Sequence, residues 1–162
     1  MLQTTIHIAA IGAGATLVLD LWSLLLKRLG MPGLDLALLG RWLGHLREGR
    51  WSHPRIADAT PIKGETWIGW SSHYAIGVGF AALLVSAYGV EWMRQPRLLP
   101  ALIIGIATAV APLLVLQPAL GAGIASSKTR TPWFNSLKSV VSHAVFGIGL
   151  YLAGWVSAWI FR

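Results

Sequence analysis

Four long runs of apolar residues limit what this chain can fold into. They cover approximately residues 4–27, 67–90, 98–124 and 137–161, and each reaches the roughly 20 residues that an α-helix needs to cross the hydrocarbon of a membrane. No run shows the alternating pattern of a transmembrane β-strand, and a helix satisfies its own backbone hydrogen bonds in lipid. The sequence therefore predicts an all-α fold, a bundle of four transmembrane helices in a single integral membrane domain over residues 1–162.

The charges are few and unevenly placed. Charged residues make up 12% of the chain, against roughly 25% in soluble domains, and the net charge of +7 comes mainly from two loops. Ten of the thirteen Lys and Arg residues lie in or beside these loops: Lys27, Arg28, Arg41, Arg47, Arg50, Arg55, Lys63, Lys128, Arg130 and Lys138. The positive-inside rule then places both loops in the cytoplasm and both termini on the opposite side. The basic charge is explained without nucleic acid, which we do not expect as a partner.

The first basic loop contains an amphipathic segment, at about residues 35–49. Leucines recur at helical spacing at positions 36, 39, 43 and 46, Asp35 can cap the start and Gly49 can end the helix. This pattern predicts a short helix lying on the membrane interface. Its basic residues Arg41, Arg47 and Arg50 would suit anionic lipid heads or an anionic substrate. The alternative is a lid on the bundle whose arginines are merely solvated.

One phrase occurs twice in the chain. SHYAIGVG at residues 72–79 and SHAVFGIG at residues 142–149 each place a histidine ahead of an apolar run, and Ala15-Thr16 matches Ala107-Thr108. This similarity predicts a two-plus-two parallel internal repeat, with each copy made of two helices inserted in the same direction. The copies would be related by an axis along the membrane normal.

Polar residues inside the apolar runs predict an intramembrane polar site. Asp20, His73 and His143 lie at a similar depth in the first, second and fourth runs. Thr16 shares the helical stripe of Asp20, Glu65 lies near the interface, and Gln117 is in the third run. An aspartate in a membrane span costs roughly 2.5–3.5 kcal/mol on insertion scales, so it needs a partner or a cavity. The two histidines are its natural partners.

The order of these motifs resembles a known family. The strings ATLVLDLWSLLLKR, LLGRWLGHLREGRWSHPRIADA, IKGETWIGWSSHYAIG, LLPALIIGIATAVAPLLVLQPALGAGIASSKT and SHAVFGIGLYLAG look like the bacterial integral membrane family catalogued as domain of unknown function 2938. The resemblance covers essentially the whole chain. It implies a multi-pass protein of a bacterial inner membrane, whose termini would then be periplasmic, but it implies no activity.

The polar site favours solute binding or ion-coupled transport. In this interpretation Asp20 titrates, His73 and His143 relay or compete for the proton, and a third helix broken at Pro112 and at Gln117-Pro118 presents carbonyls to the cavity. A second interpretation is a membrane-embedded hydrolase. There His73, His143 and Asp20 would hold zinc, and Glu65 would act as general base on a lipid-like substrate.

Two further interpretations stay open. His73 and His143 could be the axial ligands of one haem within the bundle, or the protein could be a non-catalytic assembly or structural factor whose polar residues fix helix register. The chain has no cysteine, which removes thiolate chemistry and cysteine metal sites. The sequence selects neither a cofactor nor a protein partner, and it leaves a homo-oligomer possible.

Overall fold

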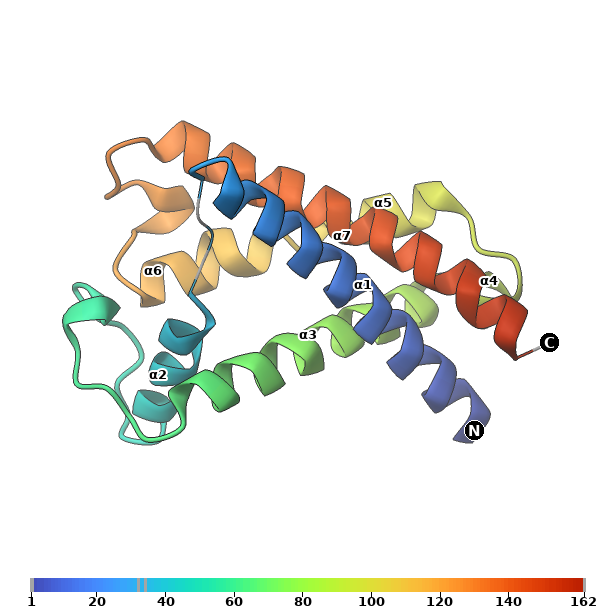
Figure 1. Cartoon of the computed structure of the whole chain (residues 1–162), viewed down its shortest axis with the longest axis horizontal. Helices are drawn as coiled ribbons and strands as arrows, with labels where there is room; N and C mark the ends of the chain where they lie inside the picture. The colour runs from blue at the N-terminus through green and yellow to red at the C-terminus, as the bar shows by residue number, and fades with distance from the viewer. Residues whose placement is uncertain (1, 32, 34, 162) are drawn as a thin grey trace. The chain divides into compact units, whose positions relative to one another are not determined.

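The structure is a computed structural model that describes residues 2–31, 33 and 35–161. This part of the chain contains helices and no strand (Figure 1). The helices are α1 (Leu2–Arg28), α2 (Leu36–Leu46), α3 (Glu65–Tyr88), α4 (Glu91–Arg94), α5 (Leu98–Ala107), α6 (Gln117–Ala119) and α7 (Pro132–Ile160), with short 3₁₀ turns at Ile56–Asp58 and Ile124–Ser126 and a π-helical segment at Ala111–Leu116.

Four helices are long and apolar enough to cross a membrane. They are Leu2–Arg28, Glu65–Tyr88, Leu98–Ala119 and Pro132–Ile160. The all-α prediction with four spanning helices is confirmed, and the architecture is compatible with a multi-pass membrane protein. The third span ends at Ala119, earlier than predicted, because Gly121 adopts φ +97°. The amides of Gly121 and Ala122 then donate back to the carbonyls of Pro118 and Gln117, which is a Schellman ending.

The third span is irregular where the sequence predicts a break. Residues Ala111–Leu116 are π-helical, and the amide of Gln117 donates to the carbonyl of Pro112, five residues back. Proline has no N–H for the regular α-helical bond and crowds the preceding turn. A π-helical insertion accommodates this loss within a continuing helix, and such insertions are frequent at functional sites.

The chain divides into two compact units. Unit 1 contains residues 1–32, 74–108 and 141–162, and unit 2 contains residues 33–73 and 109–140. Three of the four spans therefore contribute to both units. The prediction of one domain over residues 1–162 stays a prediction.

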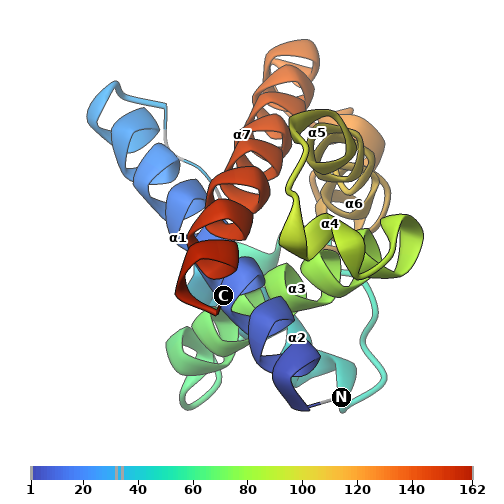
Figure 2. The ribbon, with the colours of Figure 1, turned by 90° about the vertical axis from the view of Figure 1, so that its right-hand side faces the viewer.

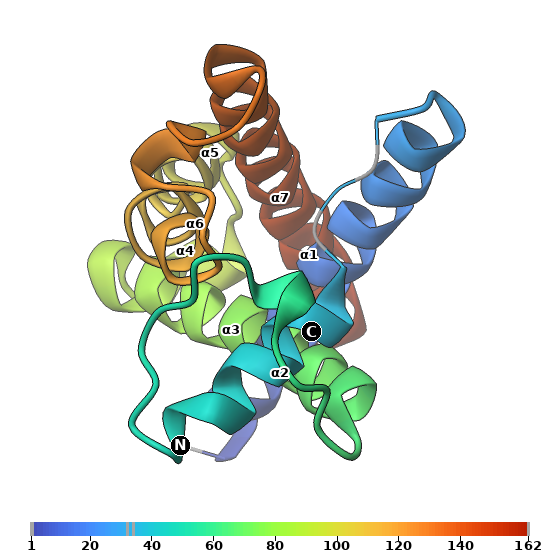
Figure 3. The same cartoon turned by 90° about the vertical axis from the view of Figure 1, so that its left-hand side faces the viewer.

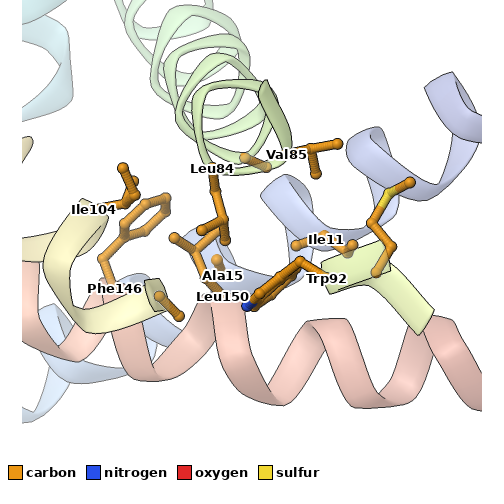
Figure 4. Packing of buried hydrophobic residues seen from close by; sticks show 11 residues of the cluster. Ile11, Ala15, Leu84, Val85, Trp92, Ile104, Phe146 and Leu150 are labelled. Atoms are coloured by element: carbon orange, nitrogen blue, oxygen red, sulfur yellow. The ribbon is translucent and has the colours of Figure 1, made fainter. Parts of the chain in front are cut away.

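Unit 1 is built from α1, α4, α5 and the adjoining parts of α3 and α7. Its buried core joins all five helices, and Figure 4 shows the packing of this cluster: Ile11, Ala15, Ala81, Leu84, Val85, Trp92, Met93, Ala101, Ile104, Phe146 and Leu150. Glycines let the helices approach closely. A Cβ on Gly77 of α3 would collide with the hydroxyl of Thr16 in α1, and a Cβ on Gly105 of α5 would lie 2.6 Å from the Cα of Gly147 in α7.

Unit 2 contains α2, the connector from residue 50 to residue 64, and the start of α3 (Figure 3). Asp35 caps α2 by accepting a hydrogen bond from the amide of Ala37 at 2.9 Å. Gly49, at φ +75°, ends it in a Schellman turn in which the amide of Arg50 donates to the carbonyl of His45. The structure thus contains the helix that the sequence predicts in this loop, with the cap and stop residues named there. Its place at a membrane interface stays a prediction.

Candidate functional site

Asp20 of α1 is held by a tyrosine of α3. The hydroxyl of Tyr74 donates to Oδ2 of Asp20 at 3.0 Å. One turn away on each helix, Thr16 packs against Gly77, so the close approach of the two backbones sets the register that brings Tyr74 to the carboxylate. The hydroxyl of Thr16 donates to the carbonyl of Gly12 at 2.8 Å within its own helix. Thr16 therefore belongs to this helix contact, but its hydrogen bond is not directed at Asp20.

A second polar contact joins α1 to α7. The indole Nε1 of Trp22 donates to Oγ of Ser142 at 3.1 Å, and both side chains are partly buried. Ser142 directly precedes His143, so the second copy of the repeated Ser-His phrase provides a hydrogen-bond acceptor for α1.

His143 is fixed by Thr108 at the end of α5. Oγ1 of Thr108 lies 3.0 Å from Nδ1 of His143 and also donates to the carbonyl of Gly105 at 2.7 Å. The single hydroxyl proton is used on Gly105, so Oγ1 accepts from His143 and the proton of the neutral imidazole is on Nδ1. Nε2 then carries the lone pair. The rings of Phe80 and Phe146 flank the imidazole, with centroids 6.3 and 6.5 Å away.

His73 lies in the part of α3 that belongs to unit 2. Its ring meets that of Trp70 edge to face, with centroids 6.2 Å apart. The prediction that Asp20, His73 and His143 form one site stays a prediction. Within the described residues, no group of three or more histidine, aspartate or glutamate side chains is arranged to hold a metal ion, and the zinc interpretation stays a prediction.

Glu65 forms a buried ion pair with Arg41. The guanidinium of Arg41 donates from Nε and Nη2 to the two carboxylate oxygens at 2.9 and 2.8 Å, and the two side chains are only 11% and 16% exposed. Nη1 of Arg41 reaches the carbonyls of Ile56, Ala57 and Ala59 at 3.1–3.3 Å. This pairing raises the pKa of Arg41 further above its ordinary value, chiefly through the hydrogen bond with Glu65.

Two sequence predictions change because of this ion pair. Glu65 is engaged by Arg41 and by the amide of Ile62 at 3.0 Å, so it is not placed as a free general base. Arg41 is 9% exposed and is not part of a lipid-facing surface. Arg47 and Arg50 are exposed, and the headgroup prediction now depends on these two residues.

Gln117 has a local role in unit 2. Its side-chain oxygen accepts a hydrogen bond from the hydroxyl of Ser126 at 3.0 Å, and Ser126 is 3% exposed with φ +58°. The contact holds the turn that follows the third span against α6. Gln117 thereby shapes the end of the broken helix. Asp20 and His143 belong to unit 1, and the prediction that Gln117 shares a site with them stays a prediction.

A histidine pair in unit 2 has no counterpart among the sequence predictions. Nδ1 of His45 lies 2.8 Å from Nε2 of His53, His45 is 2% exposed, and Nδ1 of His53 is buried without a partner among the described residues. Burial, followed by the nearby His45 and Arg50, lowers the pKa of His53. The backbone amide of His53 donates to the carbonyl of Ala119 at 2.9 Å, which ties the connector to the end of α6. The sequence carries one signal for the His45–His53 contact. Arg41 and His45 are one turn apart, on the side of α2 away from its leucines.

The comparison with protein families covers nearly all of this structure. A family model matches residues 9–157, and it is described as a protein of unknown function (DUF2938). The chain belongs to this family. No curated protein and no solved structure matches it. The description of the DUF2938 family contains no activity, so the function has to be argued from the site.

Hydrogen bonds orient two ionisable side chains in unit 1 of this DUF2938 protein. In unit 1 a carboxyl group, Asp20, is oriented by a phenol, and a neutral imidazole, His143, is oriented by a threonine. Both lie in helices that can span a membrane. Carboxyl and imidazole groups can both gain and lose a proton, and a hydrogen bond helps to orient each of these two side chains.

Proposed function

We propose that this protein binds a small cation in its membrane-embedded part and exchanges it for a proton on Asp20. The observation that carries the proposal is the hydrogen bond from Tyr74 to Asp20, inside a helix that is long and apolar enough to span a membrane. A carboxylate at such a depth is costly, and intramembrane ionisable residues mark ion and proton pathways. A carboxylate selects a cation or a proton by charge.

Tyr74 supports this function by its chemistry. A phenol hydroxyl orients one carboxylate oxygen, yet it carries no charge of its own. The carboxyl group can therefore take up a proton or contact a cation while Tyr74 keeps it in place. The Arg41–Glu65 pair of unit 2 joins its carboxylate to a permanent charge through two hydrogen bonds, which is the arrangement expected for structure rather than exchange.

His143 provides a second proton acceptor. Its Nδ1–H is used on Thr108, so Nε2 is the atom that can accept a proton. Thr108 also ends α5 shortly before the π-helical segment, the irregular part of the third span. We include His143 in the exchange pathway, and we include His73 for its equivalent place in the repeated phrase.

We further propose a bacterial inner membrane with both termini in the periplasm. The proposal is supported by the concentration of Lys and Arg in two loops. Arg47 and Arg50 would then face the anionic lipid heads of the cytoplasmic leaflet. The neighbouring Trp51 is 73% exposed, and an exposed indole beside basic residues is suited to the headgroup region.

Cation–proton exchange in proteoliposomes tests the proposal. The vesicles are acidified inside, a pH-sensitive dye reports the gradient, and Na⁺, Li⁺, K⁺ or tetramethylammonium is added outside. We expect at least one of these cations to dissipate the gradient with the native protein and with Asp58→Asn, whose carboxylate is in the exposed connector. Asp20→Asn should abolish the response. A native protein that responds to none of the four cations, or an Asp20→Asn variant that responds normally, would refute the function.

A further inference from the structure

Unit 1 contains a pocket that is separate from Asp20 and His143. It has a volume of about 460 Å³ and lies where α1 begins, beside α4 and the end of α7. Figure 2 is viewed toward this end of the unit. Its lining is mixed, with polar side chains from Gln3, Thr4, His7 and Arg94 and apolar ones that include Met93 and Phe161. A concave site with a few convergent polar groups is typical of ligand binding.

His7 brings an unsatisfied polar atom to this pocket. Its Nδ1 lies 3.3 Å from the hydroxyl of Ser157, while Nε2 is buried and has no hydrogen-bond partner among the described residues. The ring of Phe161 lies over the imidazole, with centroids 4.3 Å apart. Buried polar atoms are rarely left unpaired. Phe161 lies just beyond the end of α7 at Ile160, so rotation of its side chain would open Nε2 to a group in the pocket.

Arg94 gives the pocket its positive charge. Within the described part of the chain its partner is Glu91, at 3.1 Å, and the two side chains are 76% and 74% exposed. An exposed pair one helical turn apart is weak. Most of the donors of the guanidinium therefore remain available to an anionic group, which it can bind through two parallel hydrogen bonds.

An apolar hollow adjoins this polar pocket. It has a volume of about 250 Å³ between α1 and α7, and its lining is apolar except for Ser157. Phe161 lines both spaces, and the Ser157–His7 contact also lies at their junction. One side of the junction thus offers charge and hydrogen-bond donors, and the other offers only hydrocarbon contacts.

We propose that these two adjoining spaces bind one amphipathic anion. Its anionic head contacts Arg94 and Nε2 of His7, and its apolar chain lies in the hollow between α1 and α7. A free inorganic anion would leave the hollow unused, and a neutral amphiphile would leave Arg94 and His7 unmatched. This site is independent of cation exchange at Asp20, and either proposal can fail without the other.

Binding of decyl phosphate tests the site. The purified full-length protein in a non-ionic detergent is titrated by calorimetry with decyl phosphate, with inorganic phosphate as the head alone and with decanol as the chain alone. We expect saturable binding of decyl phosphate only. Arg94→Gln should weaken it about tenfold, the value of one charge-assisted hydrogen bond at the low end of its range. Glu91→Gln should tighten it, because it removes the competing carboxylate.

Two further variants separate a built site from general attraction. Arg97→Gln removes an equal charge close by in the sequence, at an exposed residue that does not line the pocket, and should leave binding unchanged. Leu152→Trp fills the hollow at a side chain that is 48% exposed and should weaken binding without touching the head. Equal losses in Arg94→Gln and Arg97→Gln, equal binding of inorganic phosphate or decanol, or no saturable binding of decyl phosphate would each overturn the proposal.

Discussion

Removing one partner of the buried pair Arg41–Glu65 should lower the stability of the protein more than removing one partner of an exposed ion pair such as Arg50–Glu48. Arg41 makes two hydrogen bonds to Glu65 and three to carbonyls of the connector. In Arg41→Gln these carbonyls lose their donor and the carboxylate keeps only the amide of Ile62. Removing one partner of a buried pair costs about 3–5 kcal/mol. The two side chains are still 11% and 16% exposed, which favours the lower end of this range. We therefore expect Arg41→Gln to lower the free energy of unfolding by about 3 kcal/mol.

Reversible unfolding in mixed detergent micelles, followed by circular dichroism, measures this loss. Arg50→Gln is the matched control, because its pair with Glu48 is 3.5 Å long and the side chains are 60% and 56% exposed. Such pairs contribute about 0–1 kcal/mol. The double variant Arg41→Met with Glu65→Met should be more stable than Arg41→Gln, since no buried charge is left unpaired. The reasoning is refuted if Arg41→Gln and Arg50→Gln lose the same stability.

Three further predictions concern packing, pH and the histidine of α7. Gly77→Ala should lower the melting temperature, because the new Cβ meets the hydroxyl of Thr16. Gly79→Ala should not, because the space around Gly79 is open. Equal effects of the two variants would contradict the close approach of α1 and α3. The pKa of His53 is lowered on folding, so the unfolded chain binds the proton more readily. Stability should therefore fall as the pH drops below the ordinary histidine value of 6.5. His53→Gln should flatten this part of a melting-temperature profile, and an unchanged profile would contradict it. Thr108→Val should move the imidazole proton of His143 off Nδ1, seen as a change in its ¹⁵N chemical shifts in the selectively labelled protein, while Thr129→Val should leave them unchanged.

The spanning helices could be predicted because lipid leaves the backbone few alternatives. A long apolar run must satisfy its own hydrogen bonds, so the hydropathy pattern alone indicates four spans. The helix in the first loop was also predictable, because Asp35 and Gly49 have local roles at its ends. Both inferences depend only on neighbouring residues and on the surrounding solvent.

The partners of the polar side chains were less predictable. The depth of a residue in a span does not determine which neighbouring helix its side chain faces. Asp20 accepts a hydrogen bond from Tyr74, a residue that the sequence did not single out, and the predicted pairing of Asp20 with His73 stays a prediction. Glu65 bonds Arg41 because the connector folds back over the start of α3. The path of a loop cannot be predicted from the hydropathy of its residues. The internal repeat stays a prediction: Gly77 meets α1 at Thr16, whereas Gly147 meets α5 at Ala101 and Leu102, one to two turns from Thr108, the residue that corresponds to Thr16.

The central claim is that Asp20 gains and loses a proton inside the membrane-embedded part of the protein. Infrared difference spectroscopy of the reconstituted protein, titrated from acid to alkaline pH, measures this directly through the C=O stretch of a protonated carboxyl group. We predict a titrating band that is absent from Asp20→Asn, is retained in Asp58→Asn, and shifts in frequency in Tyr74→Phe because the hydrogen bond to Oδ2 is lost. An Asp20→Asn spectrum with the same titrating bands as the native protein would show that this carboxyl group does not exchange protons.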